Sequence, residues 1–499
     1  MHCAWTSGHA PINLIGRMLL QQTLLYLPAQ LLGPAFQLLA AVAWTHFLSP
    51  SEYGVLTLVI VSQELIFYLC LYWWSQYTTR YYAAHQQDDS VGRFQPTENA
   101  MLLGNVALQA LAAGLALALA DPAWDAALMI AAIVFTATRS LNAHLAERAR
   151  ACGQIGAYTL AQTMGPVLGC VIGFVAIIGG KADAASVLAG FALAQILALP
   201  LLWHMLGLGF AVGLDRGILG VAIRFGSPLL GAAVVAWLSV NGLRVIVDKF
   251  EGAAAVGLVS VGWSLGQRAA SVAAMLVTAA AYPLAVNRLV THSRAAALAQ
   301  LSQSGALLLG IIAPVTAGLL IVNQTAVELL IGAEFQSITL AILPIAVLSG
   351  AVRNLRLHYA DQTFLLCERT EVALLVCAVE ALLTLPLCLL GLLEWGLVGA
   401  CMGCLIAHIL AALISIVIAV RGFTLPIPHV HVGKIALATL LMAVLLTAVP
   451  WPPTRLGLSL EVLCGGLAYL VAVTLLYRRG LRALMATLRP ARAESARPR

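Results

Sequence analysis

Charged residues are scarce in this chain. Asp, Glu, Lys and Arg make up only 10% of its 499 residues, whereas hydrophobic residues make up 61%. A water-soluble globular protein carries about a quarter charged residues, so this composition excludes a soluble enzyme or binding domain. No low-complexity tract and no Gly-X-Y period is present, which excludes disordered and collagen-like classes. The net charge of +6 comes mainly from short connections and a tail, so we expect no nucleic-acid binding.

Catalytic and metal-binding motifs are missing as well. The sequence contains no Gly-x-x-x-x-Gly-Lys-Ser/Thr, no His-Glu-x-x-His and no acidic metal cluster. The ten cysteines lie mostly in apolar stretches, and we interpret Cys401 and Cys404 as small packing residues. His429 and His431 lie in a Pro-rich loop without further ligands. We therefore predict no cofactor, no metal site and no enzymatic activity.

Long apolar runs dominate the sequence instead. A membrane-spanning helix needs roughly 17–25 mostly apolar residues, and 18–51, 151–180 and 395–420 contain no Asp, Glu, Lys or Arg at all. The sequence thus predicts an all-α polytopic membrane protein with about fourteen transmembrane helices. The predicted spans lie near 24–48, 55–77, 99–120, 126–145, 155–179, 185–206, 225–247, 254–282, 303–323, 338–360, 371–393, 395–420, 432–449 and 457–477. The longest connection, about 78–98, is too short for a separate catalytic domain.

The positions of Lys and Arg predict the orientation. If the N-terminus is cytoplasmic, nearly all of them, including Arg139, Arg148 and Arg150, fall on the cytoplasmic side. The opposite side then receives only the following residues: Lys181, Arg244, Lys249 and Arg455. This bias favours an even number of spans, with both termini cytoplasmic. The first residues lack the pattern of a signal peptide, and Met18 is an alternative start.

The chain also contains signs of an internal repeat. Segment 47–56 resembles 250–259, and each lies between the first and second spans of a six-span block. Because six is even, the two blocks share one orientation and are related by an axis along the membrane normal, as in transporters whose lobes rock around a central cavity. The predicted parts are a cytoplasmic segment 1–23, an N-lobe 24–207, a C-lobe 218–421, two C-terminal helices within 432–477, and a basic cytoplasmic tail 478–499 that should lie on anionic membrane lipids.

Short motifs around these turns carry a family resemblance. They are Leu48-Ser-Pro-Ser-Glu-Tyr-Gly54, the aromatic span ending in Arg80-Tyr81, Arg224-Phe-Gly-Ser-Pro228, Arg244-Val-Ile-Val-Asp-Lys-Phe-Glu-Gly252, Val256-Gly-Leu-Val-Ser-Val261 and Trp395-Gly-Leu-Val-Gly-Ala400. Together they resemble O-antigen-type polysaccharide flippases, except that Leu243 stands where that family often has Asp.

The resemblance implies the fold of the multidrug/oligosaccharidyl-lipid/polysaccharide exporters. It also implies a monomeric transporter that moves an undecaprenyl-diphosphate-linked oligosaccharide to the outer face of a bacterial inner membrane. A polysaccharide polymerase or export complex is then an expected partner.

Ionisable residues inside the spans predict a substrate cavity, because a charge in a membrane span usually marks a pathway or a partner. The repeat places Glu64 at the depth of Gln267, next to Arg268. We hypothesise that Glu64 and Arg268 face a central cavity and pair across it in one state, while a diphosphate competes for Arg268. A purely structural pair is the alternative. The other candidate cavity residues, most of them at helical spacing, are Tyr68, Ser75, Arg80, Trp237, Asn241, Arg244, Ser264 and Gln267.

A second candidate pair lies further along the chain. Glu380 and His408 are separated from Glu394 by the same number of residues, before and after it. Across a tight hairpin at 394–396 they should reach equal depth, where a carboxylate beside an imidazole could couple transport to protons or another ion. A buried pair that joins two helices is the alternative.

The leading functional hypothesis is a lipid-linked glycan flippase that acts by alternating access. A cation-coupled multidrug exporter of the same fold is an alternative that favours a more acidic cavity. A lipid II flippase is another, favoured by fourteen rather than twelve spans. A membrane glycosyltransferase or polymerase normally needs a large non-cytoplasmic loop, which this chain lacks.

Overall fold

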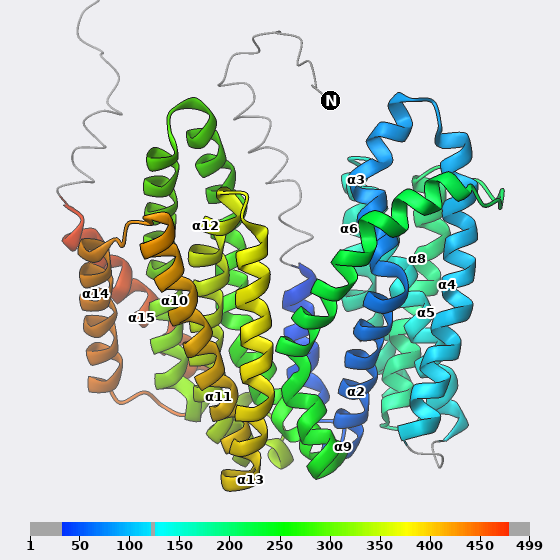
Figure 1. The fold of residues 1–499 in the computed structure, drawn as a ribbon. Coiled ribbons are helices and arrows are strands. Elements are labelled where there is room, and N and C mark those ends of the chain that lie inside the picture. The colour runs from blue at the N-terminus through cyan, green and yellow to red at the C-terminus, as the bar shows by residue number, and fades with distance from the viewer. Residues whose placement is uncertain (1–31, 121–124, 479–499) are drawn as a thin grey trace, which may run out of the picture. The chain divides into compact units, whose positions relative to one another are not determined.

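The computed structural model describes residues 32–120 and 125–478, and in these ranges every regular element is a helix (Figure 1). The all-α prediction is therefore confirmed. The predicted segment 1–23, the start of the first predicted span and nearly all of the tail 478–499 lie outside the described residues.

The helices follow one another in chain order, with four π-helical turns, η1 to η4, between them. After an apolar helix at Leu32–Trp44 come α2 (Pro50–Phe67), η1 (Tyr68–Tyr72), α3 (Trp73–Gln87), α4 (Val91–Ala120), α5 (Ala126–Ala151), α6 (Ile155–Met164), η2 (Gly165–Gly169), α7 (Cys170–Gly179), α8 (Ala184–Met205), α9 (Arg216–Thr291), α10 (Arg294–Leu330), α11 (Ala333–Leu355), η3 (Arg356–Ala360), α12 (Asp361–Leu366), α13 (Thr370–Val417), η4 (Ile418–Gly422), α14 (His429–Ala448) and α15 (Arg455–Leu476).

Within the described residues, eleven helical segments are long and apolar enough to cross a membrane. The chain is therefore a multi-pass membrane protein. The number differs from the predicted fourteen because α9 and α13 each contain two predicted spans, joined at a break in the helical backbone, at Gly252 in α9 and at Trp395–Gly396 in α13. The described part of the first predicted span is the shorter helix Leu32–Trp44. The count of fourteen stays a prediction.

The chain divides into two compact units. The first contains the described residues of Met1–Ser264 together with Ile331–Ile342 and Thr370–Ala411. The second contains Leu265–Leu330, Leu343–Arg369 and the described part of Ala412–Arg499. Helices α9, α11 and α13 pass from one unit into the other. The predicted lobe boundaries stay a prediction.

Helix α5 is central in the first unit, where it packs against α3, α4, α6 and α8. Small residues let neighbouring helices approach closely, as membrane helices often do. Where α7 meets α8, for example, a Cβ atom on Gly190 would lie 2.5 Å from the Gly173 nitrogen. This packing fixes one face of α5 towards α2, α3 and α6.

The two repeated segments contact each other directly within the first unit. A Cβ atom on Gly54 would lie 1.7 Å from the Ala253 carbonyl oxygen, and one on Gly257 would lie 2.0 Å from that of Pro50. The repeat pairs Gly54 with Gly257 and Pro50 with Ala253, so the contact is reciprocal, as a two-fold axis requires. The predicted pseudo-two-fold relation is therefore present at this helix crossing.

In the second unit, α10 packs against α14 and α15, which also pack against each other. Tyr469 donates a hydrogen bond across this group to the Gly310 carbonyl, at 2.6 Å. Arg356 and Asp361 form a buried ion pair at 3.2 Å, and Ser415 donates to the Asp361 carboxylate. The second unit is thus held together by apolar packing and a few buried polar contacts.

Candidate functional site

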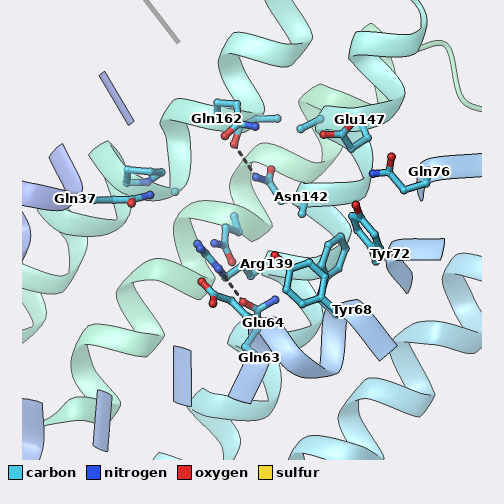
Figure 2. A pocket seen from close by; sticks show the side chains of 17 residues that line it. Gln37, Gln63, Glu64, Tyr68, Tyr72, Gln76, Arg139, Asn142, Glu147 and Gln162 are labelled. Atoms are coloured by element: carbon cyan, nitrogen blue, oxygen red, sulfur yellow. Dashed lines mark hydrogen bonds between the residues drawn. The ribbon is translucent and has the colours of Figure 1, made fainter. Parts of the chain in front are cut away.

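A polar cavity of about 270 Å³ lies inside the first unit (Figure 2). Its lining residues come from the helix Leu32–Trp44, α2, η1, α3, α5, α6, η2 and α8, and they are Gln37, Gln63, Glu64, Phe67, Tyr68, Tyr72, Gln76, Arg139, Asn142, Ala143, Ala146, Glu147, Ala161, Gln162, Gly165, Pro166 and Gln195. Most of these side chains are polar although the surrounding helices are apolar. Polar groups collected at membrane depth are expensive, so such a cavity is a candidate binding site.

Helix α5 supplies one wall of the cavity. Arg139, Asn142, Ala143, Ala146 and Glu147 are spaced by three or four residues and therefore share one face of the helix. The two alanines leave space between the longer polar side chains. Arg139 and Glu147 are about two turns, or ~12 Å, apart along the helix axis.

At one end of the cavity, Arg139 is fixed by α2. Its Nε donates a hydrogen bond to the Gln63 Oε1 at 2.9 Å, and the Gln63 Nε2 donates to the Ser140 Oγ at 3.1 Å. Figure 2 shows the Glu64 carboxylate beside the Arg139 guanidinium, and the two opposite charges attract each other. Glu64 therefore has a cationic neighbour within its own unit.

Two tyrosines form an aromatic edge of the cavity. Tyr68 and Tyr72 lie at the two ends of η1, with ring centroids 5.2 Å apart and ring planes nearly perpendicular. The wider turn of a π-helix changes which side chains share a face, and such turns occur frequently at functional sites. Figure 2 shows both rings at the cavity.

Asn142 is held by a backbone group on the opposite helix. Its Nδ2 donates to the Ala161 carbonyl at 2.7 Å. Its Oδ1 is buried and has no hydrogen-bond partner among the described residues. Gln162, which follows Ala161, lies beside it in Figure 2.

Of the predicted cavity residues in and just after the second span, the structure places two at the cavity and two away from it. Glu64 and Tyr68 line the cavity. Ser75 is buried elsewhere, with its Oγ 2.9 Å from His144 Nδ1, and Arg80 is exposed. Ser75 and Arg80 are thus not among the residues that line this cavity.

The predicted residues of α9 form a hydrogen-bonded chain that reaches the cavity. Arg244 donates to the Ser264 Oγ at 2.9 Å and to the Asn241 Oδ1 at 3.1 Å. Asn241 in turn donates to the Glu64 carboxylate at 3.3 Å. The Trp237 indole donates to the Val61 carbonyl at 3.1 Å. Asn241 therefore contacts the cavity wall at Glu64, and Arg244 is linked to the wall through Asn241.

Gln267 and Arg268 belong to the second unit. Gln267 donates a hydrogen bond to the Ser349 Oγ at 2.9 Å within that unit. The pairing of Arg268 with Glu64 stays a hypothesis.

The other predicted pair lies in the first unit. His408 Nε2 is 3.3 Å from the Glu380 Oε1, and both side chains are buried. The Trp263 ring lies 6.3 Å from the His408 ring, centroid to centroid. A role of this pair in proton or ion coupling stays a prediction.

Several polar residues of the first unit were missed from the sequence. Arg139, Asn142 and Glu147 line the cavity, although Arg139 had been assigned to the cytoplasmic side. Their spacing within the span 126–145 and just beyond it was the signal that could have revealed them. Glu98, His144 and Arg148 form a separate buried cluster. In the sequence, this cluster was indicated by the four-residue spacing of His144 and Arg148, which places them on the same face of a helix.

Comparison with solved structures identifies the fold. One similar structure is the lipid II flippase MurJ in an inward closed conformation, with 14% identity, a TM-score of 0.72, and coverage of 92% of this chain and 100% of that one. Another is an inward-facing multidrug resistance MATE family transporter of the MOP superfamily, with 13% identity, a TM-score of 0.59, and coverage of 81% and 98%. A variant of the Vibrio cholerae MATE transporter VcmN has 16% identity, a TM-score of 0.54, and coverage of 83% and 98%.

No curated protein matches the chain. Residues 44–340, which are more than half of the chain, match the family described as "Polysaccharide biosynthesis protein". This match and the shared fold confirm the resemblance that the sequence motifs indicated. The chain therefore belongs to this family of polysaccharide biosynthesis proteins.

Proposed function

We propose that this protein is a flippase that moves a lipid-linked glycan across the membrane by alternating access. The observation that carries the proposal is the polar, amide-rich and tyrosine-lined cavity inside a membrane-embedded helical unit. Such a cavity can accept a polar head group, while the lipid part of the substrate stays among apolar helices. No chemical bond is made or broken in this step, so the protein is proposed to be a transporter and not an enzyme.

The proposed substrate is an undecaprenyl-diphosphate-linked oligosaccharide that serves the synthesis of a surface polysaccharide such as O-antigen or exopolysaccharide. The family description and the similarity in fold to a lipid II flippase support a carrier-linked glycan. The proposed location is the bacterial inner membrane, with both termini cytoplasmic. A polymerase that consumes the product on the outer side would be its partner.

Multidrug export is the second candidate function. The cavity holds two carboxylates, Glu64 and Glu147, against one guanidinium, Arg139, and an acidic cavity suits organic cations. Uncharged amide side chains outnumber the charged ones, however, and they fit hydroxyl groups better than a hydrophobic cation.

Deletion of the gene tests the proposal. We expect the loss of one surface glycan and the accumulation of its lipid-linked repeat in the membrane. Unchanged glycans together with new sensitivity to cationic drugs would favour multidrug export. Lethality with accumulated lipid II would instead identify the cell-wall precursor as the substrate.

Complementation connects the cavity to this function. The variant Arg139→Met removes the charge that holds Gln63 and faces Glu64, so it should fail to restore the glycan although it reaches the membrane in normal amount. Arg288→Met, at an exposed position, is the matched control and should restore it. Full export by Arg139→Met would remove this cavity from the proposal.

A further inference from the structure

The charges that line the cavity are unevenly distributed. Figure 2 shows Arg139 and Glu64 together at one end and Glu147 at the other. Arg139 is already engaged by Gln63 and Glu64, and it lies about two helical turns from Glu147. No other Lys, Arg or His is among the lining residues. The end of the cavity near Glu147 therefore presents a carboxylate that has no cationic lining residue beside it.

Among the described residues, the ion-pair and hydrogen-bond partners of Glu147 do not belong to the cavity lining. Its carboxylate pairs with Arg150, which is about half exposed to solvent, and it accepts a hydrogen bond from Thr79 at 3.3 Å. Arg150 offsets part of the Glu147 charge, but it does not line the cavity and, being about half exposed, is screened by water. A second carboxylate that entered here would be repelled by Glu147, and it would also have to lose its hydration.

The remaining polar groups are neutral and can both donate and accept hydrogen bonds. They are the amides Gln37, Gln63, Gln76, Asn142, Gln162 and Gln195 and the two phenols Tyr68 and Tyr72. Sugar hydroxyls also donate and accept, so the two sets are complementary. The buried Asn142 Oδ1 has no partner among the described residues, so a bound hydroxyl or amide N–H would remove the cost of leaving it unsatisfied.

The size of the cavity limits what it can hold. At about 270 Å³ it is slightly smaller than sites for drug-sized ligands, which measure roughly 300–1,000 Å³. It therefore suits a small part of a glycan, such as one sugar unit, and not a whole repeat. The aromatic edge formed by Tyr68 and Tyr72 gives the apolar face of a sugar ring a surface to pack against.

From these observations, and resting on the flippase function proposed above, we propose that the cavity is a selectivity subsite that binds one neutral sugar unit of the lipid-linked glycan and rejects uronic acids. The diphosphate is bound elsewhere, because the lining has no excess positive charge to receive it. Glu147 is the residue that sets the rejection, and Asn142 is the residue that favours binding.

Binding of simple glycosides to the purified full-length protein tests the inference. Saturation-transfer NMR at neutral pH and low salt would compare the methyl glycosides of glucose, N-acetylglucosamine and glucuronic acid. We expect the two neutral glycosides to bind and the glucuronide to bind about tenfold more weakly, as expected for one repelled charge at ~1.4 kcal/mol. Equal binding of all three by the unchanged protein would overturn the inference.

Variants assign the selectivity to single residues. Glu147→Gln removes the negative charge and should bring glucuronide binding to within about twofold of glucoside binding. Gln162→Lys adds a positive charge from the opposite helix and should have the same effect, so the test survives if one variant fails to fold. Asn142→Ala should weaken the neutral glycosides about fivefold, as the loss of one hydrogen bond predicts. Glu251→Gln, at an exposed position of the same unit, is the control and should change nothing.

The outcomes separate this inference from the proposed function. Normal glycan export combined with unchanged selectivity in both charge variants would overturn the subsite and leave the flippase intact. Selective sugar binding in a protein whose deletion alters no glycan would support the cavity chemistry and overturn the flippase. Failure of every glycoside to bind, with binding of a cationic dye instead, would overturn both.

Discussion

Glu98 is a carboxylate with almost no access to water. It lies 3.1 Å from His144 Nε2 and 3.2 Å from Arg148 Nε, and none of the three side chains is more than 2% exposed. His144 Nδ1 is close to Ser75 Oγ, and the Arg148 guanidinium lies 3.2 Å from the centroid of the Tyr82 ring. This cluster ties α3, α4 and α5 together. Such a group stabilises the fold only while every charge keeps its partner.

Removal of one charge from this cluster should therefore be strongly destabilising. We expect Glu98→Gln to lower the free energy of unfolding by about 3–5 kcal/mol, because it leaves the Arg148 guanidinium buried without a counter-charge. Thermal unfolding of the purified protein in one detergent measures the change. Glu251→Gln makes the same substitution at an exposed position and should leave the transition where it is. Equal unfolding temperatures for the two variants would show that the cluster contributes no stability.

At the level of helices, the crossing of α2 and α9 depends on the absence of side chains. The Gly54 and Gly257 backbones approach the carbonyls of Ala253 and Pro50 so closely that a Cβ atom would overlap with them. Helices can approach this closely only where small residues form the contact. Because the two glycines correspond in the internal repeat, the same constraint acts twice.

Bulky substitutions at this crossing should have matched effects. We expect Gly54→Leu and Gly257→Leu each to destabilise the protein by about 1–3 kcal/mol, the usual cost of overpacking, since the two helices must move apart. Gly104→Leu on α4 is the control, because nothing lies within 4 Å of a Cβ atom there. The folded fraction after mild heating, measured by size-exclusion chromatography, should fall for the first two variants only. A large effect of one glycine without the other would contradict the two-fold relation.

The positions of most helices, and the turn at Trp395–Gly396, could be predicted from the sequence. Apolar runs locate the spans because the membrane excludes charge over a fixed thickness. The turn at Trp395–Gly396 was expected as a tight hairpin, and the structure has it: both residues leave helical φ and ψ, and the side chains of Glu380 and His408, on either side of the turn, lie 3.3 Å apart. Hydrophobicity alone does not locate such a turn, but the equal spacing of Glu380 and His408 from Glu394 does, because two helices joined by a tight turn bring these residues to the same depth. Trp395 and Gly396, the latter with a positive φ, both interrupt the helical backbone there.

The cavity was only partly predictable from the sequence. Glu64 and Tyr68 were found because a charge and an aromatic group stood out within an apolar span. Arg139 was missed because an arginine near the end of a span is assigned to the membrane surface by default. Its burial depends on Gln63 and Glu64 on another helix, and no pattern within α5 shows that partner.

At the scale of the whole molecule, the scarce charges carry the information about orientation. Arg93 lies near the start of α4 and Arg150 at the end of α5, and because these helices are consecutive and packed together, both residues lie at the same end of the pair. One further crossing, through α6, η2 and α7, leads from Arg150 to Lys181. If Arg93 and Arg150 are cytoplasmic, as the excess of basic residues there favours, Lys181 lies on the outer side.

Reporter fusions in the living cell test this orientation. Alkaline phosphatase, which is active only after export, should be active when fused after Lys181, between α7 and α8, and inactive when fused after Ser293, between α9 and α10. β-Galactosidase fused at the same two positions is the control and should give the opposite pattern. The reverse result at both positions would invert the protein in the membrane, and the proposed direction of glycan movement would then have to be abandoned. A reversal at Ser293 alone would leave the orientation of the first helices unchanged. It would show instead that α9 does not cross the membrane twice, as the two predicted spans within it require.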